Sequence, residues 1–324
     1  MHKSKGIEQK LLERIKLCQL PPLQRRSLPF ECYWKDSILI QEQKHIFSNQ
    51  WLGLGRADRL ETPGEYEVFE LCNQSLVLIR DQNKVLRLYA NTCRHRGSKL
   101  LDETGQCQAI SCPFHGWTYS LDGNLKYAKT MSENPNFDFS EHSLIEYKLK
   151  ELQGFLFAFL GDQPTDLDTQ LGDFSELHQP WSLYELVTTR REVFEVQCNW
   201  KAFLDVFNEY YHLSNIHPTS IDNLYIKPEE SDKTTGDYAS QFGFTTGTGA
   251  LLEAHQSNAL PKMENLGDPW NLGARYSWVF PNMTFAASQE AIWVYEANPI
   301  TSQSCQVRQS ICFPKNTTEL ADFK

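Results

Sequence analysis

The sequence predicts an α+β protein, and three patterns along its 324 residues support that prediction. Residues 8–20 and 37–51 place apolar side chains at helical spacing. Residues 65–90 change to short alternating runs that are typical of strands. Residues 274–314 carry three further runs rich in aromatic and β-branched side chains, which favour strands. We therefore expect helices near the N-terminus and two strand-rich regions after them.

Local signals fix several of the expected boundaries. The first helix stops before Pro21, because proline cannot continue a helix. The second helix begins after Asp36, whose side chain suits an N-cap position. Residues 117–128 predict a hairpin that turns at Asp122 and Gly123. The stretch from about 221 to 270 predicts long loops around short elements.

Composition excludes several classes of partner. The chain has 31 Lys and Arg residues against 41 Asp and Glu residues, a net charge of −10, which argues against nucleic acid and anionic membranes. No apolar run approaches the roughly 20 residues of a membrane-spanning helix. The N-terminus lacks the apolar core of a signal peptide, so the nine cysteines indicate a reducing compartment. We expect an acidic cytoplasmic enzyme.

Two Cys-and-His pairs form the first candidate metal site. Cys93 and His95 are followed, after sixteen intervening residues, by Cys112 and His115. A structural zinc site is one interpretation, because zinc is commonly held by two cysteines and two histidines. Zinc fingers usually pair Cys with Cys along the chain, whereas each loop here offers one of each. Mixed loops suit a two-iron cluster, with thiolates on one iron and imidazoles on the other.

The segments "CRHRG" and "CPFHGW" resemble the two loops of a Rieske [2Fe–2S] protein. The flanking residues agree with that pattern: Gly97, Pro113, Gly116 and Trp117. The resemblance implies that the two cysteines bind one iron and the two histidines bind the other. Respiratory-chain Rieske proteins also join the two loops by a disulfide. The matching positions here are Ser98 and Phe114, so the resemblance implies no such bridge.

A second candidate site lies in residues 199–218. His212 and His217 are five residues apart, and Asp205 and Glu209 lie just upstream. In a regular helix five residues advance about 500°, which leaves the two rings roughly 140° apart. A π-type turn brings such a pair onto one face, and these turns are frequent at functional sites. Seen alone, the pair is better explained as two unrelated histidines on a surface helix.

The same segment resembles the mononuclear iron motif of the Rieske non-haem iron oxygenases, large (alpha) subunit, in the aromatic-ring-hydroxylating dioxygenase family. The resemblance implies that His212 and His217 bind Fe(II), which activates O₂ when two imidazoles and one carboxylate share a face. Glu209 and Asp205 are the candidate catalytic acids. Glu209 matches the acid that bridges the iron to the Rieske centre of a neighbouring subunit in a ring of three.

The third iron ligand is expected to be a carboxylate more than 100 residues beyond the second histidine, as the resemblance implies. Asp322 is the only acid near that place, but "TELADFK" looks like the start of the relevant helix. We therefore expect the ligand to follow Lys324 and the given sequence to be a fragment.

The resemblance also implies the domain organisation. Residues 1–44 form a helical segment that packs on or near the catalytic domain, and residues 45–163 form a β-rich Rieske [2Fe–2S] domain. Residues 164–324 form the catalytic mononuclear iron domain, a curved antiparallel sheet wrapped on helices (helix-grip, START-like), truncated at its C-terminus.

The implied function is that of a terminal oxygenase. Electrons from a separate NAD(P)H-dependent reductase or ferredoxin pass through the [2Fe–2S] cluster to Fe(II), where O₂ is used for hydroxylation, dihydroxylation or oxidative demethylation. The substrate is a small aromatic or quaternary ammonium compound, and the assembly is a homotrimer or a multiple of it. The alternatives are a Rieske-type electron carrier or regulatory protein with an inactive second domain, and then a zinc-structural protein.

Six aromatic residues on the expected C-terminal strands have two possible roles. They can form a cation-binding cage or pack in the core, which is their commoner use. These residues are Tyr276, Trp278, Phe280, Phe285, Trp293 and Tyr295.

Overall fold

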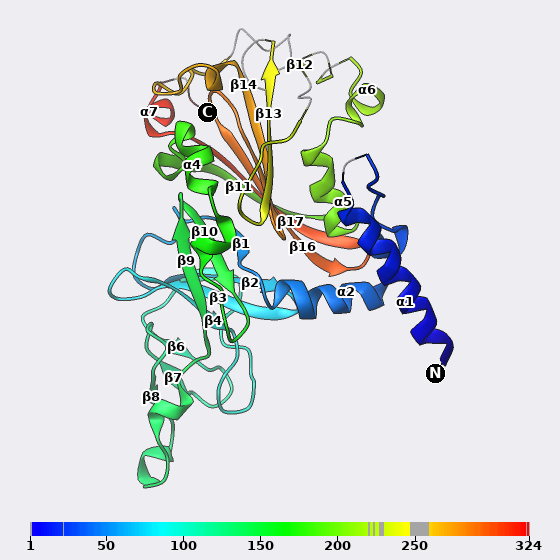
Figure 1. Ribbon diagram of the computed structural model, residues 1–324. Coiled ribbons are helices and arrows are strands. Elements are labelled where there is room, and N and C mark those ends of the chain that lie inside the picture. The colour runs from blue at the N-terminus through cyan, green and yellow to red at the C-terminus, as the bar shows by residue number, and fades with distance from the viewer. Residues whose placement is uncertain are drawn as a thin grey trace.

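The computed structural model has the predicted mixture of helices and antiparallel sheets (Figure 1). It describes residues 2–21, 23–219, 221–222, 224–226, 230–246, 259–321 and 323. The candidate ligand Asp322 lies outside the described residues. In Figure 1 strands β1 to β10 occupy the lower half of the molecule and strands β11 to β17 the upper half.

The lower half contains two sheets. Among the described residues the larger sheet has seven antiparallel strands in the order β1-β10-β9-β4-β3-β2-β5. Its strands are β1 Leu52–Arg56, β2 Glu65–Leu71, β3 Gln74–Arg80, β4 Leu86–Ala90, β5 Thr104–Gln106, β9 Glu146–Leu152 and β10 Phe155–Phe159. The smaller sheet has β6 Ile110–Ser111, β7 Thr118–Tyr119 and β8 Leu125–Tyr127. The predicted turn at Asp122 and Gly123 is confirmed between β7 and β8, where the Gly123 amide donates to the Ser120 carbonyl at 2.9 Å.

The upper half is one curved antiparallel sheet with helices along its sides (Figure 1). Its order in the described part of the chain is β11-β17-β16-β15-β14-β13-β12. The strands are β11 Leu186–Val196, β12 Tyr225–Ile226, β13 Tyr238–Thr245, β14 Gly273–Val279, β15 Met283–Ala287, β16 Ile292–Thr301 and β17 Ser304–Pro314. The predicted strands over 274–314 are therefore confirmed. Strand β13 lies in the stretch that the sequence predicts as loops, because its alternation is short and interrupted by glycine.

The helices are short except the first. They are α1 His2–Lys16, α2 Asp36–Glu42, α3 Leu167–Leu171, α4 Phe174–His178, α5 Trp200–Asp205, α6 Leu213–Ile216 and α7 Lys315–Thr318. Single 3-10 turns cover Leu17–Gln19, Phe30–Tyr33, Met131–Glu133, Phe139–His142, Gln179–Trp181, Leu183–Glu185, Val206–Asn208 and Trp270–Leu272. No helix in the described part of the chain is long and apolar enough to cross a bilayer.

The second helix departs from its prediction in two ways. It changes at Glu42 into a π-type turn over Gln43–Phe47, so it ends before residue 51. The N-cap position belongs to Lys35, which makes no side-chain capping bond. The Asp36 carboxylate instead accepts a hydrogen bond from the Ser302 hydroxyl at 2.6 Å. A tertiary contact with the far end of the chain therefore takes the group that the sequence assigns to capping.

Strand β10 joins the two halves because both of its faces are buried. Phe155, Phe157 and Phe159 pack into the core of the upper sheet. Leu156 and Ala158 face a second core that also contains residues of α5 and β17. A continuous apolar run is the pattern expected of a strand that is covered on both faces.

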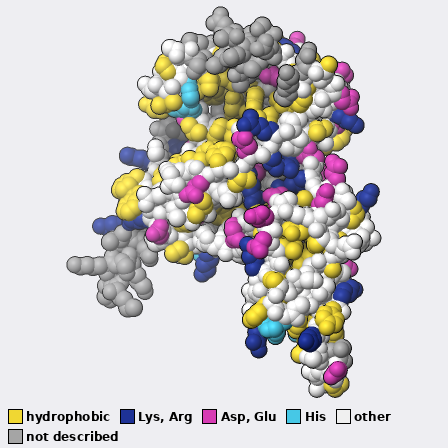
Figure 2. All heavy atoms as spheres, turned by 180° about the vertical axis from the view of Figure 1, so that it is seen from behind, with side chains coloured by type: hydrophobic (Ala, Val, Ile, Leu, Met, Phe, Trp, Pro, Cys, Tyr) yellow, Lys and Arg dark blue, Asp and Glu magenta, His cyan; other side chains and the backbone are white. Residues whose placement is uncertain are grey.

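Charged side chains meet where β1 and β2 approach the upper sheet, and Figure 2 shows basic and acidic side chains mixed across the middle of the molecule. Arg59 pairs with Glu67 at 3.1 Å. Arg308 of β17 lies 4.0 Å from the same carboxylate and pairs across the strands with Glu296. The Glu296 side chain lies against Gly55, where an added Cβ would meet its Oε1 at 2.8 Å. Glu296 is therefore buried between the two halves of the molecule.

Replacing Glu296 by Gln should flatten the pH dependence of stability. Burial raises the pKa of Glu296 to about 7, and Arg308, Arg59 and Arg191 oppose that shift while Glu67 adds to it. Between pH 4.5, the ordinary pKa of this group, and pH 7, the folded state therefore binds a proton that the unfolded state has released. The free energy of unfolding contributed by this group falls as pH rises through that window, by on the order of 1–3 kcal/mol.

Melting temperatures of wild type and Glu296→Gln across pH 5 to 8 measure this effect, at about 2–4 °C per kcal/mol. The two proteins should melt alike near pH 5, and the variant should melt several degrees higher above pH 7. Parallel curves for the two proteins would show that Glu296 stays charged throughout.

Candidate metal centres and active site

The two Cys-and-His loops have the same backbone design. In each loop the cysteine amide donates to the carbonyl five residues on, and the cysteine carbonyl accepts from the glycine amide four residues on. The four bonds are Cys93 to Ser98 at 2.8 Å, Gly97 to Cys93 at 3.0 Å, Cys112 to Trp117 at 2.8 Å and Gly116 to Cys112 at 3.0 Å. Gly97 and Gly116 have φ values of +73° and +70°, a left-handed conformation that glycine adopts without a Cβ clash.

The four predicted ligand side chains lie together at the ends of these loops. Cys93 and Cys112 are buried, with 3% and 4% of their surface exposed. The His95 and His115 rings lie 4.8 Å apart between centroids. Trp117 stacks on His95 at 4.9 Å with an interplanar angle of 9°, which fixes that ring. Two buried thiols and two more exposed imidazoles form a donor set that fits a two-iron cluster.

Backbone amides surround the sulfur atoms. Burial raises the pKa of Cys112, but the amides of Phe114 and His115, together with the Cys93 and Ser98 side chains, lower the pKa of this thiol overall. Burial raises the pKa of Cys93, although Tyr119 and the His95 amide oppose it. These donors favour thiolates, the form in which cysteine binds metals.

The segment that carries the second candidate site is a broken helix. Helix α5 ends at Asp205, a 3-10 turn follows over Val206–Asn208, and Glu209 is extended with φ −145° and ψ 159°. The predicted π-type turn between His212 and His217 is therefore wrong. The two histidines instead flank the single turn of α6, as its N-cap and C-cap residues.

This break brings the two rings together. The centroids of His212 and His217 are 5.7 Å apart at an interplanar angle of 76°. The Glu209 carboxylate lies 2.5 Å from Nδ1 of His212 and also accepts the backbone amides of Tyr211 and His212. Glu209 therefore caps the turn and holds the imidazole. With Nδ1–H donated to this carboxylate, Nε2 of His212 is free to bind a metal.

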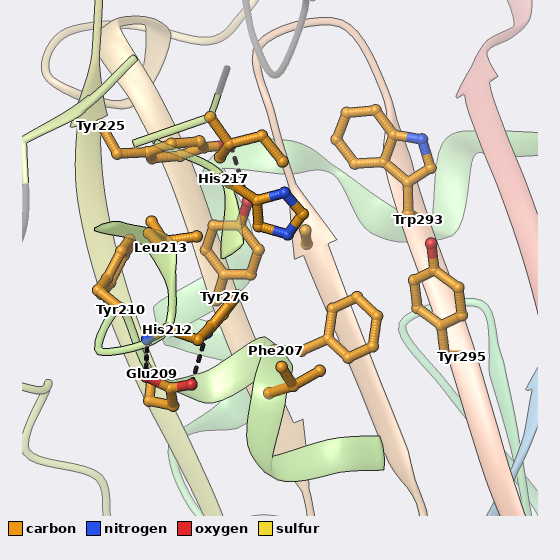
Figure 3. A pocket seen from close by; sticks show the side chains of 13 residues that line it. Phe207, Glu209, Tyr210, His212, Leu213, His217, Tyr225, Tyr276, Trp293 and Tyr295 are labelled. Carbon is orange, nitrogen blue, oxygen red and sulfur yellow. Dashed lines mark hydrogen bonds and ion pairs between the residues drawn. The ribbon is translucent and has the colours of Figure 1, made fainter. Parts of the chain in front are cut away.

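Both histidines face a cavity of about 350 Å³ (Figure 3). Its lining residues are Val206, Phe207, Glu209, Tyr210, His212, Leu213, His217, Ile221, Tyr225, Tyr276, Ala286, Trp293 and Tyr295. Ala286 of β15 pairs across the sheet with Tyr276 on one side and Trp293 on the other. A small side chain between two large ones leaves a hollow whose floor is Ala286.

Five of the six aromatic residues singled out from the sequence divide between the two roles, and the sixth, Phe280, is half-buried beside Trp278. Tyr276, Trp293 and Tyr295 line the cavity. Phe285 belongs to the core of the upper sheet, and Trp278 packs against the second core. Tyr210 and Tyr225 line the cavity as well, and sequence reasoning missed both. Tyr225 lies in the stretch predicted as loops, where no periodic signal marks it.

The N-terminal segment is fastened to the helix before the histidines. Lys201 is buried and pairs with Glu42 at 2.7 Å, and the Trp200 indole donates to the same carboxylate at 3.0 Å. The Tyr33 hydroxyl donates to Asp205 at 2.8 Å. Burial raises the pKa of Asp205, although this bond opposes the shift. Asp205 is thus placed beside the N-terminal segment and is absent from the described cavity lining, and sequence reasoning missed Tyr33 and Glu42.

The described residues hold no group of three or more His, Cys, Asp or Glu side chains arranged to bind a single metal ion. Two protein ligands per iron suffice for a Rieske cluster. A mononuclear O₂-activating iron takes a carboxylate beside its two histidines, and the candidate Asp322 lies outside the described residues.

Replacing Gly116 by Ala should lower cluster content, because its φ of +70° is unfavourable for a residue with a Cβ by roughly 1–2 kcal/mol. Gly267→Ala is the matched control, since an added Cβ there meets nothing within 4 Å and its φ is unremarkable. Iron and sulfide per chain, with the visible absorbance, measure the outcome. Equal cluster content in both variants would contradict the role given to this turn.

Two family models match the chain. Residues 50–144 match the Rieske [2Fe-2S] domain, and residues 183–324 match the ring hydroxylating alpha subunit (catalytic domain). The first match contains both Cys-and-His loops, and the second contains both histidines of the broken helix.

Relatives and solved structures agree with these models. The carnitine monooxygenase oxygenase subunit of Acinetobacter pittii is 31% identical over 67% of this chain and 59% of its own length. The glycine betaine monooxygenase oxygenase subunit of Chromohalobacter salexigens is 30% identical over 64% of this chain and 46% of its own. The chain thus spans less than two thirds of the length of these curated relatives.

A solved quaternary ammonium Rieske monooxygenase, studied for carnitine oxidation by gut microbiota and inter-subunit electron transfer, superposes with a TM-score of 0.75 at 26% identity. That superposition covers 90% of this chain and 77% of the other. With both family models matched in order along one polypeptide, the chain belongs to the Rieske non-haem iron oxygenases, large (alpha) subunit.

Proposed function

We propose that the protein is the terminal oxygenase of a Rieske non-haem iron system that oxidises a small quaternary ammonium compound with O₂. One observation carries the proposal: the imidazoles of His212 and His217 face an aromatic cavity, and Glu209 binds the His212 ring. The same chain also contains the two Rieske loops. In such a reaction one oxygen atom enters a C–H bond of the substrate. Two electrons and two protons convert the other atom to water.

We assign the metal ligands as follows. Cys93 and Cys112 hold one iron of the cluster, and His95 and His115 hold the other. His212 and His217 hold the mononuclear iron, which supplies O₂ activation when it is bound. The buried thiols, the paired imidazoles and the amides directed at sulfur support the first assignment. The 5.7 Å ring separation of His212 and His217 supports the second.

The aromatic wall of the cavity supports a cationic substrate. Phe207 stacks against Tyr295 at 4.7 Å, and Trp293 lies two residues before Tyr295 on the same face of β16. The faces of such rings attract a methylated ammonium group. The relatives named for carnitine and glycine betaine act on compounds of this class, which agrees with the proposal.

We propose that electrons arrive from a separate NAD(P)H-dependent reductase or ferredoxin and pass between neighbouring subunits of a homotrimer. Figure 1 places the loops around β6 to β8 and helix α6 at opposite ends of the molecule, so transfer within one chain is unfavourable. Tyr211 beside Glu209 is 90% exposed and Phe114 beside His115 is 64% exposed, as expected of surfaces that meet a partner. The cytoplasmic location stays a prediction.

We also keep the expected division into residues 1–44, 45–163 and 164–324 as a proposal. The two family matches fall inside the second and third of these ranges. In this scheme the N-terminal unit supports the catalytic one, because Tyr33 and Glu42 hold the helix that leads to the histidines. Asp205 then acts by positioning that helix.

Substrate-dependent O₂ uptake tests the proposed function. The iron-loaded protein with NADH and a reductase is given a trimethylammonium compound or, in parallel, benzoate. We expect O₂ uptake and an oxidised product with the ammonium compound alone. A cluster that is reduced and reoxidised with no substrate-dependent uptake would favour the alternative of an electron carrier.

Substitution of one histidine at each site should separate the two centres. His115→Ala should abolish the Rieske absorbance and EPR signal while iron remains at the other site. His212→Ala should keep the cluster spectrum and abolish oxygenation. Metal analysis with EPR of the two variants measures this, and a cluster spectrum that survives His115→Ala would refute the ligand assignment.

Glu209→Gln should slow electron transfer between subunits with both metals still bound. The amide cannot accept as strongly as the carboxylate from His212, so ring orientation and the link to the neighbouring imidazole both weaken. Cluster reoxidation after rapid mixing with O₂ and substrate measures the rate. We expect a fall of about 10–100-fold, and wild-type rates would count against the bridge.

A further inference from the structure

Three tyrosine rings form the wall of the cavity opposite Trp293. Tyr210, Tyr225 and Tyr276 have ring centroids 6.0 to 6.3 Å from one another. The hydroxyls of Tyr225 and Tyr276 are 2.8 Å apart, and Figure 3 shows this bond on the side of the cavity that carries His217. All three side chains line the cavity.

The hydroxyl pair has one more O–H hydrogen than its mutual hydrogen bond uses. Two phenols bring two O–H hydrogens, and their mutual bond uses one of them. Among the described residues no further acceptor takes the second hydrogen. Tyr225 is 7% exposed, Tyr276 is half-buried, and both line the cavity, so the second hydrogen is available to an acceptor that enters the cavity. A donor that gains such an acceptor adds to binding.

The protonation of the pair is secure at neutral pH. Burial raises the pKa of Tyr225 to about 12 and that of Tyr276 well above its ordinary value. Both groups therefore remain phenols and act as donors. Tyr210 does not compete for the same role, because its hydroxyl lies toward Gly243 of β13, where an added Cβ would meet it at 2.5 Å.

We propose that the Tyr225–Tyr276 pair is a recognition site for an acceptor oxygen of the substrate. The inference rests on the proposed function, since it assigns the aromatic wall to the ammonium group and the hydroxyl wall to this oxygen. Tyr276 and Trp293 stand two strands apart with Ala286 between them, about 10 Å at the level of the backbone. That width suits a compact molecule with its ammonium group at one wall and its oxygen at the other.

Matched substrates test the inference. Choline carries a hydroxyl, glycine betaine carries a carboxylate, and propyltrimethylammonium has the shape of choline without any oxygen. The assay uses the iron-loaded oxygenase with its reductase. We expect kcat/KM for the better of the two oxygen-bearing compounds, choline or glycine betaine, to exceed that for propyltrimethylammonium by about tenfold. The comparison of choline with glycine betaine shows whether the oxygen is a hydroxyl or a carboxylate.

The double variant Tyr225→Phe with Tyr276→Phe should erase this preference, so that the ratio of kcat/KM for the oxygen-bearing compound to kcat/KM for propyltrimethylammonium falls to about one. A double variant is needed, because either phenol alone retains one hydrogen to donate. Tyr295→Phe and Tyr210→Phe are the controls. Tyr295 accepts from Gln309 at the opposite wall, so its loss should leave the preference intact. Melting temperature and the Rieske EPR signal confirm that each variant is folded and loaded.

The outcomes are distinct. A preference retained in the double variant, or lost in Tyr295→Phe, overturns the inference while oxidation of ammonium compounds upholds the proposed function. Failure of wild type to oxidise or bind any of the three compounds overturns both. The assignment is supported if the double variant loses the preference and both control variants keep it.

Discussion

The Glu209 carboxylate is the interaction on which the catalytic cavity depends. The chain leaves helix α5, turns once, and becomes extended at Glu209 before α6 begins. The carboxylate satisfies the amides of Tyr211 and His212 at the start of that new turn and holds the His212 ring with its second oxygen. The same group therefore breaks the helix, caps the next turn and directs an imidazole into the cavity. Without it the two rings would diverge.

Contacts from the rest of the fold hold that segment in place. Buried contacts from Glu42 and Tyr33 fix α5 from one side, and the second core containing Trp200 and Leu204 fixes it from another. Strand β10 and the cluster around Glu296 hold the lower sheets to the upper one. The Rieske loops at the far end have their own rigid turns, so each metal site is preorganised independently. In the proposed scheme electron transfer depends on assembly, since the two sites of one chain lie at opposite ends.

The sequence predicted most surely what is local. The Cys-and-His loops are defined by residues within a few positions of each other, and their glycines mark the turns, so the clustering of the four side chains and the turn geometry were both predictable. The convergence of His212 and His217 was predictable, but the break in the helix that brings them together was not, because it arises from Glu209 capping the turn. Tyr225 and Tyr33 escaped prediction because their roles depend on partners 51 and 172 residues away. Asp36 failed as a cap because Ser302 bonds to it from across the molecule.

The central claim is that one chain carries a histidine-ligated two-iron cluster and a separate O₂-reactive iron. Anaerobic iron and sulfide analysis combined with nitrogen hyperfine spectroscopy of the reduced protein tests it most directly. The account predicts three irons and two sulfides per chain, with two imidazole nitrogens coupled to the mixed-valence cluster. Zinc in place of iron, or a reduced cluster without coupled nitrogens, would contradict it.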